Sequence, residues 1–130
     1  MIWDPIRCCS VEATPEEIVR QKWILAMLGP LGYPKGLLSI EKGIPFLKRR
    51  VDILCYTPHK EGLVPLLLVE CKAEDEGVLP EKQVFGYNFT IHAPFLCVIQ
   101  GDSAKTFWKE SEALASVPFL PSYPQLISKL

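Results

Sequence analysis

Two carboxylates and one lysine interrupt apolar stretches that resemble strands. Asp52 lies inside one such stretch, Glu70 closes another, and Lys72 follows two positions later. Burying charge in strands is costly unless the charge is paired or binds a metal. Carboxylate oxygens suit Mg²⁺ or Mn²⁺, and a lysine beside such an ion can orient or deprotonate an attacking water. These residue types suit phosphodiester hydrolysis, and the alternative is a salt bridge at a strand end.

Two neighbouring strands must position these side chains. Successive strand residues alternate between faces, so Glu70 and Lys72 emerge on one side and Cys71 on the other. Residues 65–71 are nearly all apolar, as expected for a central strand, and a short turn-rich connection precedes them. We therefore expect an antiparallel pair, with Asp52 across from Glu70. In the strand over 50–56, alternation predicts two opposed sets: Val51, Ile53 and Cys55 against Asp52 and Leu54.

A helix is predicted from Thr14 to about Leu28. Thr14 suits the N-cap, proline occupies the first helical position, and Gly29 with Pro30 ends the helix. Glu17 lies three residues past the cap, where it completes a capping box.

The remaining elements complete one α/β domain over residues 1–130, with an extended N-terminal arm over 1–13. We expect a mixed central sheet flanked by helices, in the order α-β-β-β-α-β. The other expected elements are a strand over 37–42, a helix over 80–92, a strand over 93–100, a short strand over 106–109 and a C-terminal helix over 124–130.

Composition limits the class of protein. The chain has 130 residues, a net charge of −1 and a pI near 6.1, which is unfavourable for a nucleic-acid binder but does not exclude one. The absence of a signal-like N-terminus or a membrane-length apolar run favours the cytoplasm. Five cysteines without a C-x-x-C pair argue against disulfides and zinc, and three are expected to be small buried hydrophobes: Cys55, Cys71 and Cys97.

The order of these motifs resembles the PD-(D/E)XK nucleases, and within them the N-terminal domain of type I restriction enzyme R subunits, including small stand-alone relatives. The resemblance covers residues 14–108. Its motifs are Thr14-Pro15-Glu16-Glu17-x-x-Arg20-Gln21, Ile40-Glu41-Lys42, Lys48-Arg49-Arg50-Val51-Asp52, Glu70-Cys71-Lys72, Gln83-x-x-x-Tyr87-Asn88, Ala93-Pro94-Phe95 and Gln100-Gly101.

The resemblance implies a restriction-endonuclease-like core and a Mg²⁺- or Mn²⁺-dependent deoxyribonuclease. Asp52, Glu70 and the backbone carbonyl of Cys71 are then expected at the metal, with Lys72 serving the nucleophilic water. Glu17 matches an acid that this family's first helix contributes to the metal site. Both interpretations of Glu17 therefore stay open, as a helix-capping residue and as a site acid. Glu16 is the alternative site acid if the helix phase differs. Further site residues implied are Gln83 and Tyr87, which lie one helical turn apart on one face. Arg49 and Arg50 flank the expected site and are, with Tyr87, candidates for phosphate contacts; the alternative for the two arginines is a solvated charged face.

The expected partner is DNA, with a homodimer or a larger restriction or repair assembly as the alternatives for how the chain acts, and no membrane is expected. The alternative function is a non-catalytic or partner-dependent module that binds DNA or assembles on the same fold.

Overall fold

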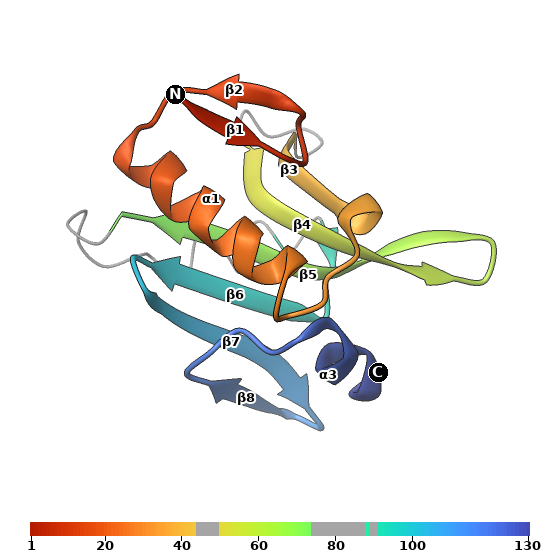
Figure 1. Cartoon of the computed structure of the whole chain (residues 1–130). Coiled ribbons are helices and arrows are strands. Elements are labelled where there is room, and N and C mark those ends of the chain that lie inside the picture. Colours follow the sequence, from red (N-terminus) through yellow and green to blue (C-terminus); the bar gives the residue numbers. More distant parts are fainter. Residues whose placement is uncertain (44–49, 74–87, 89–90) are drawn as a thin grey trace.

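The computed structural model describes residues 1–43, 50–73, 88 and 91–130 of the chain (Figure 1). The elements, in chain order, are β1 (Ile2–Asp4), β2 (Cys9–Val11), α1 (Pro15–Leu28), η1 (Lys35–Leu37), β3 (Leu38–Gly43), β4 (Arg50–His59), β5 (Gly62–Lys72), β6 (Phe95–Gln100), β7 (Ser103–Glu110), β8 (Ala113–Val117) and α3 (Tyr123–Ser128).

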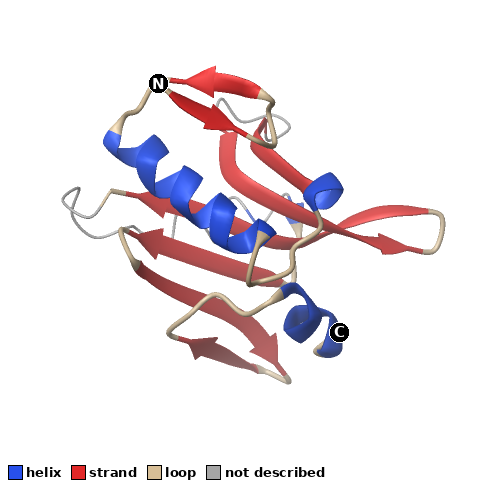
Figure 2. Ribbon diagram, in the orientation of Figure 1, coloured by secondary structure: helices blue, strands red, loops and turns tan. Residues whose placement is uncertain are grey.

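A six-stranded sheet in the order β3-β4-β5-β6-β7-β8 forms the centre of the molecule (Figure 2). β5 and β6 run parallel, and the other neighbouring pairs of this sheet are antiparallel. The predicted mixed sheet is therefore confirmed, as is the antiparallel pairing of β4 with β5. Of the helix expected over 80–92, only Asn88, Ile91 and His92 lie within the described residues, and the first two are helical.

Helix α1 packs across one face of the sheet (Figure 1). It begins as predicted, because the Thr14 hydroxyl oxygen accepts the backbone N–H of Glu17 at 3.1 Å, and it ends at Leu28. Ile24 and Met27 are fully buried in the larger apolar cluster. That cluster also takes in side chains of the sheet and of α3: Ile53, Cys55, Leu67, Val69, Cys71, Phe95, Cys97, Ile99 and Leu126.

The opposite face of the sheet carries a smaller apolar cluster, and it corrects the alternation expected for the strand at 50–56. Ile53 packs on the α1 side as predicted, but Val51 packs with Leu54 in the smaller cluster. Asp52 joins neither the β3 nor the β5 register, and its neighbour on β3, Glu41, has a positive φ of 53°. The pairing is interrupted at Asp52 without a change of register on either side, and the Asp52 side chain faces α1, where it contacts Arg20.

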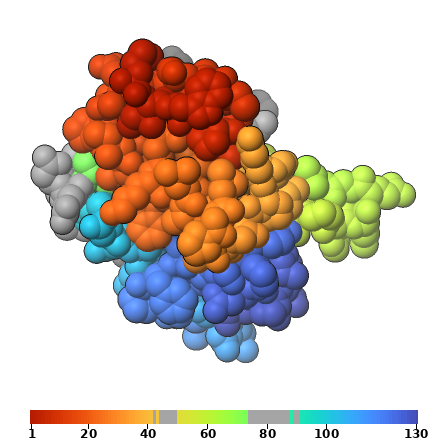
Figure 3. All heavy atoms as spheres, viewed as in Figure 1, coloured from red at the N-terminus to blue at the C-terminus, as the bar shows by residue number. Residues whose placement is uncertain are grey.

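Both ends of the chain contain more strand than expected. Residues 1–13, expected as an extended arm, form the hairpin β1–β2, which lies over the beginning of α1 (Figure 1). β7 is longer than the short strand expected at 106–109, and β8 was not expected. The far end of the β4–β5 hairpin pairs only with itself from Tyr56 to Pro65, and Figure 3 shows it projecting from the body.

The cysteines follow the sequence expectation. Cys55, Cys71 and Cys97 are buried, Cys8 and Cys9 are exposed, and all of them are free thiols. Among the residues that the structure describes, no helix is long and apolar enough to cross a membrane.

Candidate functional site

Asp52 occupies a buried position between β5 and α1. Its side chain is 5% exposed and both of its oxygens accept hydrogen bonds. Oδ1 accepts the guanidinium of Arg20, with Nε at 3.1 Å and Nη2 closer still. Oδ2 accepts the backbone N–H of Cys71 at 2.9 Å. The expected site aspartate is therefore held rigidly by one helix and one strand, as a buried carboxylate requires.

The Glu70 carboxyl reaches Asp52 from the adjacent strand. Oε1 accepts the backbone N–H of Asp52 at 3.2 Å. Burial first, and then the neighbouring Asp52 carboxylate, raise the pKa of Glu70 to about 9, and the protonated form hydrogen-bonds to Asp52. Glu70 ionises beside Asp52 only at a high cost, because a second negative charge there is buried and repelled by the first. The structure thus brings the Glu70 carboxyl to Asp52.

Arg20 on α1 links the carboxylates around Asp52. Its Nη1 donates to Oε1 of Glu17 at 2.9 Å and to Oε1 of Glu41 at 3.1 Å. Burial opposes the charge on Arg20, but the carboxylates of Asp52, Glu17 and Glu41 outweigh burial and raise the pKa of Arg20 above its usual value. The guanidinium is therefore a permanent cation within an acidic cluster.

The β1–β2 hairpin brings a second arginine to this cluster. Arg7 donates from Nη2 to Oε1 of Glu17 at 2.7 Å and from Nε to Oδ2 of Asp4 at 2.6 Å. Gln21 also donates to both acids, at 2.9 Å to Asp4 and 3.2 Å to Glu17. Asp4 is fully buried, yet the hydrogen bonds from Arg7 and Gln21 overcome burial and lower its pKa. The hairpin is thereby fastened to the start of α1.

The structure separates the two interpretations of Glu17. Its backbone N–H completes half of the expected capping box with Thr14. Its carboxylate accepts from Arg7, Arg20 and Gln21, which places it beside Asp52 through the shared guanidinium. The acid at this position therefore belongs to the cluster.

Not every predicted site residue joins the contact network. Lys72 is partly buried at the end of β5 and, within the described residues, makes no ion pair. Arg50 is exposed and donates from Nη1 to the backbone carbonyl of Glu41 at 3.1 Å. Three predicted residues lie outside the described residues: Arg49, Gln83 and Tyr87.

The donor chemistry at Asp52 fits a hard divalent cation in part. Asp52 and Glu70 present carboxylate oxygens, and an ion between them would relieve the repulsion that keeps Glu70 protonated. A ready-made group of three or more His, Cys, Asp and Glu ligands is not found among the described residues. The side chains therefore suit Mg²⁺ or Mn²⁺, which also bind water and backbone oxygens, better than a metal needing an all-protein cage.

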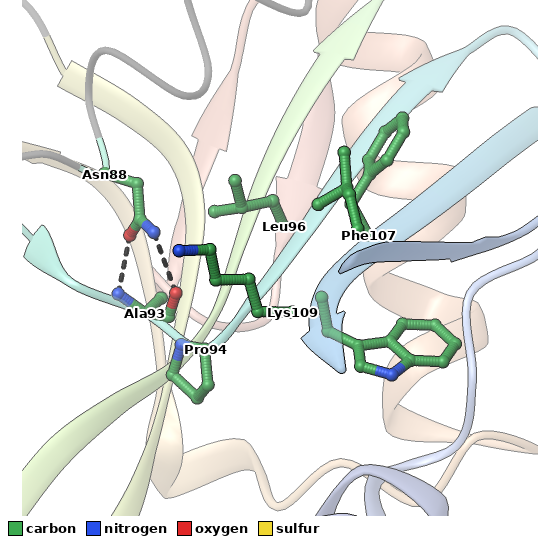
Figure 4. Close-up of a pocket in the computed structure, with 8 residues that line it drawn as sticks. Asn88, Ala93, Pro94, Leu96, Phe107 and Lys109 are labelled. Atoms are coloured by element: carbon green, nitrogen blue, oxygen red, sulfur yellow. Dashed lines mark hydrogen bonds between the residues drawn. The ribbon is translucent and has the colours of Figure 1, made fainter. Parts of the chain in front are cut away.

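A separate pocket of about 310 Å³ lies on the side of the sheet away from α1, at β6 and β7 (Figure 4). The Asn88 side chain closes one wall by accepting the Ala93 N–H at 2.5 Å and donating to its carbonyl at 2.8 Å. The described lining is largely apolar and includes one charged side chain, that of Lys109. This composition lacks the acids needed for metal-assisted hydrolysis, so the Asp52 cluster remains the candidate site.

Sequence reasoning found the acids but assigned no role to the arginines that hold them. Arg20 and Gln21 were named only as part of the motif at the first helix, without a role in the site. Arg7 and Asp4 were not predicted to be site residues. A signal for Arg20 was present, since it shares a helix face with Glu17, Ile24 and Met27 at the spacing of buried positions. Two of its partners, Glu41 on β3 and Asp52 on β4, are distant in sequence and are found only from the three-dimensional arrangement.

The chain was compared with protein families, with curated proteins and with solved structures. The family described as type I restriction enzyme R protein N terminus matches residues 15–124, which include α1, Asp52, Glu70 and Lys72. Neither the curated proteins nor the solved structures gave a match. Because the match spans most of the chain, this protein belongs to the family of type I restriction enzyme R protein N-terminal domains.

Proposed function

We propose that this chain is a divalent-metal-dependent nuclease that cleaves DNA at the Asp52–Glu70 site, on a PD-(D/E)XK-type core. The contact between two carboxyls from adjacent strands carries the proposal. Burial first, and then the nearby Asp52 carboxylate, raise the pKa of Glu70 to about 9, an arrangement that is costly for folding and useful for binding a cation. Membership of a restriction-enzyme family supports DNA as the substrate.

Each residue has a distinct task in the proposed reaction. Asp52 and Glu70, with the backbone carbonyl of Cys71, hold Mg²⁺ or Mn²⁺, which when bound supplies a Lewis acid for the phosphate. Arg20 and the backbone N–H of Cys71 orient Asp52 toward Glu70. Lys72 is without an ion pair in the described part of the chain, so its side chain can orient the attacking water as the ammonium or accept a proton from it as the neutral amine. Exposed Arg50 is placed to meet a phosphate.

A second candidate function is a module of the same fold that needs a partner before it can act, or that only assembles on DNA. One observation favours it: both oxygens of Asp52 are already occupied, one by Arg20 and one by Cys71 N–H. The net charge of −1 also predicts weak DNA affinity for the chain alone.

Cleavage assays distinguish these functions. The purified chain is incubated with single-stranded, duplex and branched DNA, with Mg²⁺, with Mn²⁺ and with chelator. The nuclease proposal predicts cleavage with a metal and none with chelator. Asp52→Asn and Glu70→Gln should each weaken Mn²⁺ binding in calorimetry, whereas Glu61→Gln, at the exposed hairpin turn, should leave it unchanged. Cleavage in chelator, or full Mn²⁺ affinity in both site variants, would refute the assignment.

A further inference from the structure

The cluster around Asp52 holds more negative than positive side chains among the described residues. Its acids are Asp4, Glu16, Glu17, Glu41, Asp52 and Glu70, and its arginines are Arg7 and Arg20. An acidic excess of this kind calls for a further cation. The proposed function accounts for the acids at Asp52 and Glu70 but gives Arg20 no part beyond orientation.

Arg20 has the geometry of a bound cation rather than of a surface residue. It is 5% exposed and its guanidinium donates to three acids on different elements: Glu17 on α1, Glu41 on β3 and Asp52 on β4. Glu16 lies 3.6 Å from the same guanidinium. One fixed positive charge thus neutralises the same carboxylate, Asp52, that the proposed metal needs.

We propose that Arg20 is a positioning residue whose charge opposes the divalent cation at Asp52, so that the metal-free site is held closed by its own arginine. The inference rests on the proposed function, because it takes Asp52 and Glu70 as the metal ligands. A metal at these acids meets the Arg20 charge at short range and must share Asp52 with it. Without that charge the carboxylates of the cluster are no longer neutralised by Arg20, and the metal then binds to them more tightly.

The coupling between Arg20 and the metal must be reciprocal. If the Arg20 contact weakens metal binding, then metal binding weakens the hold of Arg20 on Asp52 by the same factor. Couplings of this kind are typically on the order of 5- to 150-fold in affinity. Arg7 reaches the cluster only through Glu17, Asp4 and Glu41, so its effect has the same sign and is smaller.

Calorimetric titration of Mn²⁺ into the full chain, free of DNA, tests the inference. Arg20→Gln should lower the dissociation constant at least about tenfold. Arg20→Lys keeps the charge and should stay nearer to the unmodified protein. The matched control is Lys22→Gln, which removes a positive charge from the same helix at an exposed position that pairs with Asp102. Screening should limit the control to about twofold.

Unchanged or weaker Mn²⁺ binding by a folded Arg20→Gln variant would overturn the inference. If that variant does not fold, as judged by circular dichroism, Arg7→Gln decides: tighter binding supports the inference and unchanged or weaker binding overturns it. If the protein binds Mn²⁺ through Asp52 but these variants do not bind it more tightly, the inference fails and the proposed function stands. If neither the unmodified protein nor any variant binds Mn²⁺, both the proposed function and the inference fail.

Discussion

The buried face of α1 is made of two unlike halves. Towards its N-terminus the helix buries Glu17, Arg20 and Gln21, and towards its C-terminus it buries Ile24 and Met27. Both halves are packed against the same sheet, and buried side-chain polar atoms without a partner do not occur in the described residues. Burying apolar side chains stabilises a fold directly, whereas a buried ion cluster roughly offsets its own desolvation.

The difference indicates where stability and function reside. The apolar half holds the helix on the sheet, and the polar half brings acids from α1, β3 and β4 to one place. A helix selected for stability alone gains more from apolar residues at positions 17, 20 and 21. We propose that the polar half serves the cation site rather than folding, and we expect the two halves to respond to substitution in opposite ways.

The largest effect is expected at Lys72, at the end of β5 that also carries Glu70. Lys72→Ala should reduce DNA cleavage by about 10²- to 10⁴-fold, because it removes the proposed proton-transfer group. Thermal unfolding should be nearly unchanged, since the lysine makes no ion pair within the described residues. The control is Lys60→Ala at the exposed hairpin turn. Equal cleavage rates for the two variants would remove Lys72 from the reaction.

Ile24→Ala removes a buried side chain from the apolar half of α1. This residue is fully buried, so the substitution should lower the free energy of unfolding by about 2–5 kcal/mol. Mn²⁺ affinity of the folded fraction should stay unchanged, because Ile24 contacts the core and not the acids. The paired control, Leu25→Ala, alters an exposed neighbour and should cost far less in denaturant unfolding. A large change in Mn²⁺ affinity would show that the halves are not separable.

Glu70→Gln tests how the protonation of Glu70 affects the stability of the metal-free protein. The folded pKa of Glu70 is about 9 against 4.5 for an ordinary glutamate, so the stability from its protonated form is full below about pH 4.5 and lost as pH rises through about 9. Glutamine mimics the protonated form. The variant should gain roughly 1–3 kcal/mol near pH 9 and little near pH 4.5 in urea unfolding with chelator. Lower stability of the variant at high pH would contradict the raised pKa of Glu70 in the folded protein.

The smallest effect is expected at the cap of α1. Thr14→Ala removes the acceptor for the Glu17 N–H and should cost about 0.5–2 kcal/mol of stability. Thr14→Ser keeps the acceptor and serves as the control. Because the Glu17 carboxylate is held by Arg7 and Arg20 and not by the cap, metal affinity should be unaffected. A loss of Mn²⁺ affinity would tie the cap to the site.

Local signals in the sequence predicted the elements that position the site. The cap at Thr14 and the break at Gly29 gave the bounds of α1, and the turn residues after Tyr56 gave the antiparallel β4–β5 pair. The interruption of the β3–β4 pairing at Asp52 was not predicted, because it accompanies the positive φ of Glu41 on the neighbouring strand. The contacts of Arg20 with Glu41 and Asp52 were missed because these partners are distant in sequence.

The central claim is that Asp52 and Glu70 are two halves of one cation site. Crystals of the protein soaked in Mn²⁺ and measured at the manganese absorption edge test it most directly. We expect one anomalous peak between the two carboxylates, with oxygens of both within roughly 2.0–2.3 Å. A peak held by Glu16 or Glu41 without Asp52 and Glu70, or no peak while the protein cleaves DNA with Mn²⁺, would contradict the account.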